Sequence, residues 1–178
     1  MTLDSEMLAV SCFASRLGWM GLLTNGGRVE RLTFGHPTKA AARQALPSPR
    51  LAVAEVIEEQ CELVERLQTY AAGGQQNFDD VPVAFFGLSA FQVSVLGQCR
   101  RILYGQTCSY AELALQAGHQ GAARAVGNCM AINPVPLIVP CHRVVQAGGR
   151  PGQYSAPGGT GMKRQLLAME AKIWPRIA

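Results

Sequence analysis

The first part of the chain carries the hydrophobic pattern of β-strands. Residues 8–15 are apolar enough for a strand, and two further strand-like runs, 19–24 and 29–34, flank Asn25-Gly26-Gly27. Asparagine followed by glycine tolerates the positive φ that a tight turn between strands requires. The sequence therefore predicts a strand followed by a β-hairpin.

Helical spacing follows the predicted hairpin. The alanine-rich segment 38–45 predicts a short helix after Pro37. A longer helix is predicted to begin at Ser48-Pro49, because proline suits the first turn of a helix, and to end at Gly73-Gly74. Its hydrophobic residues recur at helical spacing; they are Leu51, Ala54, Ile57, Cys61, Val64 and Leu67.

The second half of the chain has the pattern of several helices. Ser89 and Ser109 each begin a capping-box pattern, with Gln92 and Glu112 three residues on, which predicts helices from both serines. The second of these helices is predicted to end near Gly118. Further helices are predicted at 121–130 and at about 160–171, with a glycine-rich loop at 148–161 before the last one.

These patterns predict two domains, 1–83 and 84–178, joined by a linker at 75–88. The first is an α/β domain with a small antiparallel sheet and helices. The second is mostly α, and its two short helices joined by a glycine-containing turn have the helix-turn-helix layout, with a winged-helix-like form.

Composition excludes several classes of protein. The chain has 178 residues, 48% hydrophobic and 16% charged, which is typical of a globular protein and not of a disordered one. No apolar stretch is long enough to span a membrane, and residues 1–6 lack the basic region of a secretion signal. The six cysteines have no compact spacing and form no CxxC pair. We therefore expect reduced thiols in the cytoplasm, and neither a disulfide framework nor a structural zinc site.

Charge is divided unevenly along the chain. Before residue 84, 7 Lys and Arg stand against 10 Asp and Glu, a net charge of −3. From residue 84 onward, 9 stand against 2, a net charge of +7. A basic second half indicates a polyanion partner, such as nucleic acid.

The most reactive candidate is Cys141, which precedes His142 in the stretch Val139–Val145. Prolines at 134, 136 and 140 keep this stretch out of a helix. A neighbouring imidazole can help to form the thiolate, which is the nucleophilic form of cysteine. A buried cysteine that only packs the core is the alternative, and the pair alone does not decide between the two.

The 121–130 helix is a second candidate, because Arg124 is its one long basic side chain among alanines and glycines. Small residues suit tight helix packing, and they also suit a helix laid in the minor groove of DNA with a side chain wedged between bases. Sequence-specific readout in the major groove needs several base-reading side chains, which this helix lacks.

Three segments then identify a family. Arg124–Gly127, Asn133–Pro136 and Pro140–Val145 closely resemble, in order and spacing, the C-terminal domain of the O6-alkylguanine-DNA alkyltransferases. Supporting segments extend the resemblance over about half of the chain; they are Phe91-Gln92, Tyr104–Thr107, Ser109-Tyr110, Tyr154-Ser155 and Leu166–Glu170. The first half of the chain resembles the family only in outline.

The resemblance implies direct DNA repair. The alkyl group of O6-alkylguanine, and also of O4-alkylthymine, would pass irreversibly from duplex DNA to Cys141, once per molecule. His142 would act as the base through a bound water, and Glu170 would orient His142. Tyr110 would donate a hydrogen bond to guanine N3, and Asn133 would be a hinge that bonds the backbone around Cys141.

The resemblance also assigns the DNA contacts. The damaged nucleotide would be flipped out through the minor groove, with Arg124 in the gap that it leaves. The other DNA-binding positions would be Ala122, Ala123, Ala125, Gly127 and Ser109. Ser155 would bond guanine O6, the carbonyls of Cys141 and Val144 would accept from the guanine amino group, and Tyr154, Met130 and Pro136 would complete the pocket. We expect a monomer that needs no cofactor or metal, with duplex DNA as its partner and no membrane association.

The chain departs from the family in the loop before the last predicted helix, and three other functions compete with alkyl transfer. The segment Ala156–Gly161 is longer than the compact Ser-Gly-Gly form of the family, which leaves the size of the accepted alkyl group open. An alkyltransferase-like protein that only binds lesions would lack the cysteine. A helix-turn-helix regulator would need base-reading side chains, and a Cys-His hydrolase would need an oxyanion hole.

Overall fold

The first half of the chain forms a four-stranded sheet. The structure, a computed structural model, describes residues 8–46, 55–56 and 61–171. The strands are β1 (Leu8–Ser15), β2 (Gly18–Asn25), β3 (Arg28–His36) and β4 (Glu55–Val56), in the order β3-β2-β1-β4. The predicted strand and hairpin are confirmed. The sheet is not antiparallel throughout, because β4 runs parallel to β1.

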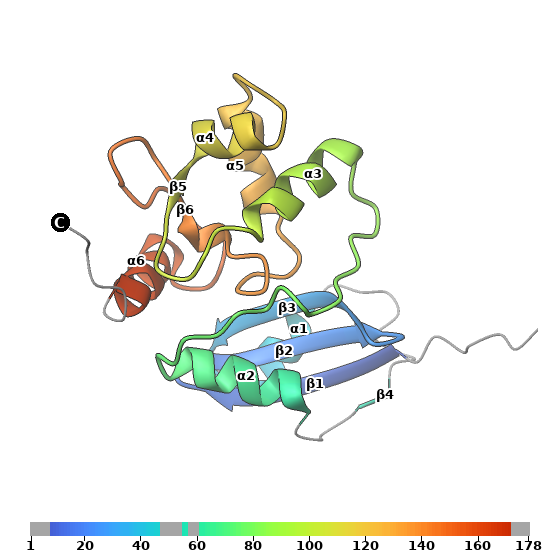
Figure 1. The fold of residues 1–178 in the computed structure, drawn as a ribbon. Helices are drawn as coiled ribbons and strands as arrows, with labels where there is room; N and C mark the ends of the chain where they lie inside the picture. The colour runs from blue at the N-terminus through green and yellow to red at the C-terminus, as the bar shows by residue number, and fades with distance from the viewer. Residues whose placement is uncertain (1–7, 47–54, 57–60, 172–178) are drawn as a thin grey trace, which may run out of the picture.

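Two helices cover opposite faces of this sheet, α1 (Lys39–Gln44) behind it and α2 (Glu62–Ala71) in front of it in Figure 1. Met20 and Leu22 of β2 belong to the core that includes Leu67 of α2, whereas Leu23 packs in a smaller cluster on the other face. On that second face, a Cβ added to Gly21 would lie 2.8 Å from the Ala42 carbonyl oxygen of α1. Glycine at this position therefore lets α1 approach the sheet closely.

The long helix predicted from Ser48-Pro49 is wrong in part. Its beginning lies in 47–54 and 57–60, outside the described residues. Between those ranges, Glu55 and Val56 pair with Ala9 and Val10 as β4, and the described helix α2 begins after its N-cap, Cys61. The edge of β1 offers backbone hydrogen bonds that helical spacing along the sequence does not reveal. The predicted end is confirmed: α2 stops at Ala71, and Gly73 has a φ of +94°.

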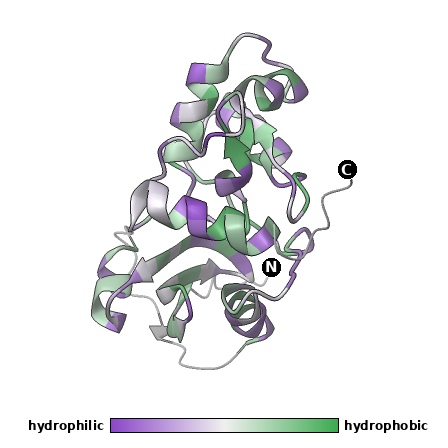
Figure 2. Cartoon of the chain, turned by 90° about the vertical axis from the view of Figure 1, so that its left-hand side faces the viewer, coloured by the Kyte–Doolittle hydropathy of each residue, from purple (hydrophilic) through white to green (hydrophobic). Residues whose placement is uncertain are grey.

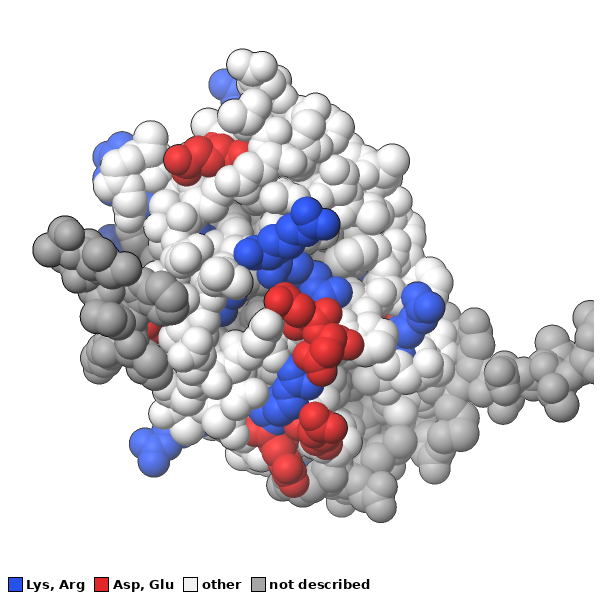
Figure 3. All heavy atoms as spheres, viewed as in Figure 1, with Lys and Arg blue, Asp and Glu red and all other residues white. Residues whose placement is uncertain are grey.

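The predicted linker packs against the sheet. Val29 of β3 donates from its backbone nitrogen to the Pro82 carbonyl (2.8 Å), and its carbonyl accepts from the Ala84 nitrogen (2.9 Å). Arg66 of α2 bonds Asp80 at 2.8 and 2.7 Å, and opposite charges lie side by side on this face in Figure 3. A single cluster of buried hydrophobic residues runs through both halves of the chain, from Leu17 to Leu166. The division into two domains at residue 84 remains a prediction.

The second half is mostly helical. Its elements are α3 (Ala90–Cys99), β5 (Cys108–Ser109), α4 (Tyr110–Gln116), α5 (Ala123–Ala131), the 3₁₀ turn η2 (Cys141–Arg143), β6 (Val144–Val145) and α6 (Gly159–Ala171). Both predicted capping boxes are present, at Ser89 and Ser109. Helix α5 begins two residues later than predicted, because Gly121 has a φ of +84°, outside the helical range.

Hydrophobic residues gather in the interior elements, and hydrophilic residues lie more often on outward parts of the helices (Figure 2). The parallel pair of β5 and β6 lies inside the second half and joins Cys108 to Val144. This pairing fixes the chain directly after η2. Among the described residues, no helix combines the length and apolar character needed to cross a membrane.

Candidate active site

A braced loop carries Cys141 to its position in η2. Asn133 donates from Nδ2 to the Val139 carbonyl (2.8 Å), and its Oδ1 accepts from the Val135 nitrogen (3.1 Å). Between these contacts, Leu137 has a φ of +72°. A residue with a large side chain adopts this conformation only at a cost in free energy. The Asn133 side chain therefore holds a strained loop, and the Cys141 nitrogen closes it on the Val139 carbonyl at 2.8 Å.

The thiol of Cys141 is almost fully enclosed, with 2% of the residue exposed. Burial raises the pKa of this thiol, and the side chains of Asn133 and Tyr154 and the charge of Lys163 offset part of that rise. The resting form near neutral pH is therefore the thiol, and a nucleophilic attack needs a base beside it.

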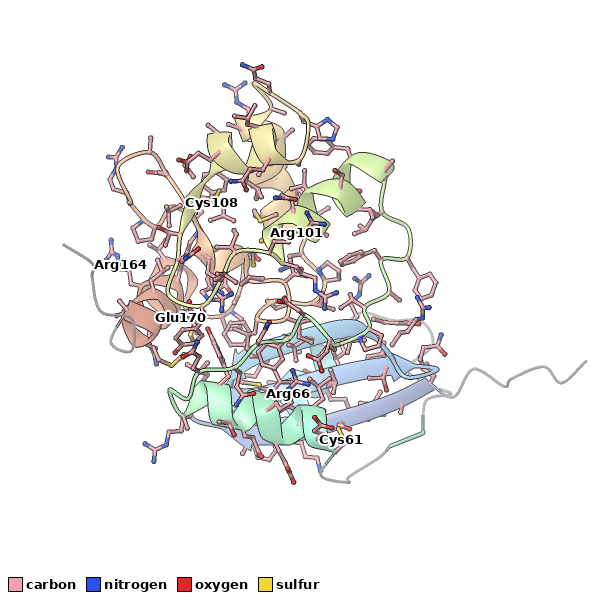
Figure 4. The ribbon with its side chains drawn as sticks, in the orientation of Figure 1. Cys61, Arg66, Arg101, Cys108, Arg164 and Glu170 are labelled. Atoms are coloured by element: carbon pink, nitrogen blue, oxygen red, sulfur yellow. The ribbon has the colours of Figure 1, made fainter. Side chains whose placement is uncertain are left out.

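His142, the residue after Cys141, forms a buried pair with Glu170, in which His142 Nε2 lies 2.9 Å from Glu170 Oε1. Figure 4 places Glu170 on α6, at the level where the helical half meets the sheet. A carboxylate only accepts hydrogen bonds, so we assign the proton to Nε2, which leaves the Nδ1 lone pair available as a base. Nδ1 makes no hydrogen bond to any described residue. Burial lowers the pKa of His142 more than Glu170 raises it, so the imidazole is neutral at rest.

Besides the Gly105 backbone nitrogen, which donates to Oε2 at 3.1 Å, two further side chains hold Glu170, and neither was predicted from the sequence. Arg143 donates from Nη2 to Oε1 and from Nε to Oε2, each at 3.0 Å, and from Nη1 to the Ile102 carbonyl at 2.6 Å. Tyr70 of α2 donates its hydroxyl to Oε1 at 2.7 Å. Burial would raise the pKa of Glu170, but His142 and Arg143 outweigh it and hold that pKa far below its usual range.

The sequence held a signal for only one of these two residues. Arg143 directly follows His142 in the motif, so its place beside the site could have been inferred. Tyr70 lies 100 positions before Glu170, and only the folded chain brings them together.

Cys141 lines two cavities. One, of about 340 Å³, is lined by Cys141 together with four predicted residues, Tyr110, Met130, Tyr154 and Ser155. The other, of about 330 Å³, is also lined by Cys141, Tyr154 and Ser155, and adds the predicted Asn133 and Pro136. Its far wall comes from the first half of the chain, through Arg31, Leu32, Thr33, Phe34, Ala45 and Leu46.

Lys163 of α6, which is 1% exposed, was also missed by the sequence analysis. It lines the first cavity and donates from Nζ to the Val144 carbonyl (2.5 Å) and to the Tyr110 hydroxyl (3.4 Å). Burial lowers the pKa of this lysine, although the nearby thiols Cys141 and Cys99 oppose that effect. Val144 itself lines neither cavity, and only its carbonyl is directed to a side chain of the site.

Helix α5 borders the first cavity through Gly127, Asn128 and Met130. Arg124 and Ala125 are exposed on this helix, while Ala122, at its N-cap, and Ala123 are half-buried. A Cβ on Gly127 would lie 3.9 Å from the Tyr110 ring, which is ordinary contact. Ser109 uses its hydroxyl to cap α4, where it accepts from the Glu112 nitrogen. Within the described ranges, no group of three or more His, Cys, Asp or Glu side chains could hold a metal ion.

Comparisons with known proteins point to one family. Residues 90–172 match the family model "6-O-methylguanine DNA methyltransferase, DNA binding domain". A methylated-DNA–protein-cysteine methyltransferase of Mycolicibacterium paratuberculosis is 44% identical over 112 residues, which are 63% of this chain and 66% of the relative. The match therefore spans slightly less than two thirds of that protein.

Solved structures match nearly the whole chain. The crystal structure of the Mycobacterium tuberculosis O6-methylguanine methyltransferase is 33% identical with a TM-score of 0.77, and the match covers 96% of both chains. The Mycobacterium tuberculosis OGT in complex with DNA is 33% identical with a TM-score of 0.75, over 92% of this chain and 93% of that one. The similarity extends over both halves of the chain, and the structure brings a cysteine, a histidine and a glutamate together beside a cavity. The chain therefore belongs to the O6-methylguanine-DNA methyltransferase family.

Proposed function

We propose that the protein repairs DNA directly, by transferring the alkyl group of O6-alkylguanine to Cys141. The observation that carries this proposal is the buried Cys141 thiol, which lines a cavity next to the His142–Glu170 pair. The names of its relatives support the reaction class, because they are methyltransferases that act from methylated DNA on a protein cysteine. One solved relative is bound to DNA.

The reaction begins with removal of the thiol proton. His142 Nδ1 takes the proton from Cys141, through a bridging water, and Glu170 stabilises the imidazolium that forms. The sulfur attacks the alkyl carbon; the S–C bond forms as the C–O6 bond breaks. Guanine leaves and takes up a proton, so the products are a thioether on Cys141 and an undamaged base.

Residues of the first cavity are suited to the leaving group. Tyr110 would donate to guanine N3 as negative charge develops on the base, and Ser155 would donate to O6. The contact between Lys163 and the Tyr110 hydroxyl places a cation behind that donor. The carbonyls of Cys141 and Val144 would accept from the guanine amino group, which requires the Val144 carbonyl to be shared with Lys163. A cavity with this set of donors would also accommodate O4-alkylthymine.

Guanine O6 is hidden in duplex DNA, so the nucleotide must leave the stack. We infer that α4 and α5 act as a helix-turn-helix pair, with α5 in the minor groove and Arg124 in the place of the flipped base. The exposure of Arg124 and Ala125 and the small residues Ala122, Ala123 and Gly127 support a close approach to the groove.

The thioether is not readily reversed, so we infer one turnover per molecule without a cofactor. All six cysteines, which fall in the described ranges, are free thiols. We propose a monomer, and the free thiols fit a reducing compartment such as the cytoplasm.

The test is the intact mass of the protein after incubation with a duplex that contains one O6-methylguanine. Wild type is expected to gain the mass of one methyl group and to saturate at one per molecule, whereas Cys141→Ser should gain none and still bind the duplex. An unchanged wild-type mass, with lesion binding intact, would place the protein among non-catalytic lesion-binding proteins instead.

A further inference from the structure

We propose that Tyr70, on α2 of the first half of the chain, is a positioning residue for alkyl transfer and acts through Glu170 on His142. This inference rests on the proposed function. It also gives the first half a direct part in the chemistry, beyond supporting the second half.

The contacts of the Tyr70 hydroxyl carry the proposal. Its oxygen lies 2.7 Å from Glu170 Oε1 and 3.2 Å from His142 Nε2, so one hydroxyl touches both members of the pair. Tyr70 is fully buried. Its ring is fixed by edge contacts with Phe78 and Tyr104, each with ring centroids 6.1 Å apart. The hydroxyl therefore has little freedom to leave this position.

Proton counting gives these contacts a direction. Glu170 is ionised and can only accept, so the single proton of the Tyr70 hydroxyl points to Oε1, and the Nε2 proton of His142 points to the same oxygen. The Tyr70 oxygen lies 3.2 Å from Nε2 and, with its own proton on Oε1, can only accept from the Nε2–H. Tyr70 thus restrains the plane of the imidazole and so the direction of the Nδ1 lone pair.

The hydrogen bond from Tyr70 to Glu170 also changes the negative charge that the carboxylate presents to His142. A donor on Oε1 disperses the negative charge of the carboxylate, so less of it is available to stabilise an imidazolium. The charged and titratable groups around the pair are Tyr70 on α2, Tyr104 before β5, Arg143 in η2 and Lys163 on α6, with Tyr154 close to Tyr70. With the Tyr70 hydroxyl gone, Glu170 should favour protonated His142 more strongly.

A tyrosine that only fills the core is the competing explanation, and Tyr104 provides its control. Tyr104 is 6% exposed and packs against the same ring, but its hydroxyl makes no hydrogen bond to any described residue. Tyr104→Phe therefore removes a buried hydroxyl from the same cluster without changing the contacts of Glu170.

The experiment compares Tyr70→Phe, Tyr104→Phe and wild type in single-turnover methyl transfer from an O6-methylguanine duplex across pH. Tyr70→Phe is expected to transfer the methyl group about 10-fold more slowly than wild type, which is a part of the usual contribution of a positioned base. The fall in its rate on the acid side of the pH profile should move to higher pH. Tyr104→Phe should stay within about twofold of wild type, because it changes no contact of Glu170. Rates are taken per folded molecule, from urea unfolding curves at the same pH, so lost stability does not count as lost chemistry.

A double-mutant cycle tests whether Tyr70 acts through Glu170. Adding Tyr70→Phe to Glu170→Gln should cause little further loss of rate if the two residues share one interaction. The inference would be overturned if Tyr70→Phe and Tyr104→Phe had the same rates and the same pH profiles. It would also be overturned if Tyr70→Phe caused the same loss of rate in wild type and in Glu170→Gln. A wild-type protein that transfers no methyl group would reject the proposed function instead.

Discussion

At the scale of single residues, Glu170 and His142 couple the stability of the fold to pH. The pKa of Glu170 is held far below its usual range, and burial lowers the pKa of His142. For both groups the unfolded chain binds protons more readily than the folded one. Their contribution to stability is therefore present above the unfolded pKa values and is lost as the pH falls.

We predict that the free energy of unfolding decreases as the pH drops below about 6.5, and further through the carboxyl range near about 4.3. Glu170→Gln should cost about 3 kcal/mol at neutral pH, because it leaves the buried Arg143 without its anion. This loss should shrink on acidification. Urea unfolding at several pH values measures both effects, and a pH-independent difference between the two proteins would contradict the assignment of Glu170 as ionised.

Arg124 carries the second prediction at this scale. Arg124→Ala should slow methyl transfer from duplex DNA by at least about 10-fold, because in the proposed mechanism this side chain fills the stack when the base is flipped out. Transfer from the free base O6-benzylguanine should be unchanged, since no flipping is needed. Arg164, exposed on α6 and directed away from the molecule in Figure 4, is the matched control. Equal losses for Arg124→Ala and Arg164→Ala would indicate a general charge effect.

The sequence predicts those site residues that lie close together along the chain, and misses those that only the fold brings together. Cys141, His142 and Asn133 lie within ten positions of one another, so one motif carries them. Tyr70 and Lys163 have no such motif, because a tyrosine or a lysine in a helix is ordinary until the fold buries it beside the site. The sequence also cannot reveal that the Val144 carbonyl already accepts from Lys163.

At the scale of elements, the two serine caps allow folding and DNA binding to be separated. Ser89 and Ser109 make the same reciprocal capping box, on α3 and α4. Each Ser→Ala change should cost about 1 kcal/mol in urea unfolding. Only Ser109→Ala should also weaken binding to duplex DNA in a Cys141→Ser background. If both variants bind DNA equally well, Ser109 is a cap and not a DNA contact.

Elements with local signals were predicted best. The Asn25-Gly26 turn and both capping boxes are encoded within a few residues, and the structure contains each of them. Strand β4 was missed because its evidence lies elsewhere, on the free edge of β1. The segment 81–84 was likewise expected to be a linker, and its hydrogen bonds to Val29 depend on the edge of β3.

At the scale of the whole molecule, the two halves share one core and jointly enclose Cys141. Helix α2 contributes Tyr70 to the buried pair, and β3 and the end of α1 form a wall of the second cavity. The backbone also joins them, since the Leu32 nitrogen donates to the Pro134 carbonyl at 2.9 Å. A change in the first half can therefore alter the chemistry without touching the reacting atoms.

The second cavity gives this expectation a test on substrate size. With the base in the cavity of Tyr110 and Met130, an alkyl group larger than methyl must extend past the Cys141 sulfur into the cavity lined by Ala45 and Leu46. Ala45→Phe should fill that space. The rate of benzyl transfer should then fall by about 10-fold or more, which corresponds to a size effect of at least about 1.4 kcal/mol. The rate of methyl transfer should stay near that of wild type. Ala40→Phe, at an exposed position of α1, is the control for a bulky residue near Ala45, which caps the end of that helix. Equal loss of benzyl and methyl transfer in Ala45→Phe would mean that the wall supports the thiol and does not select the alkyl group.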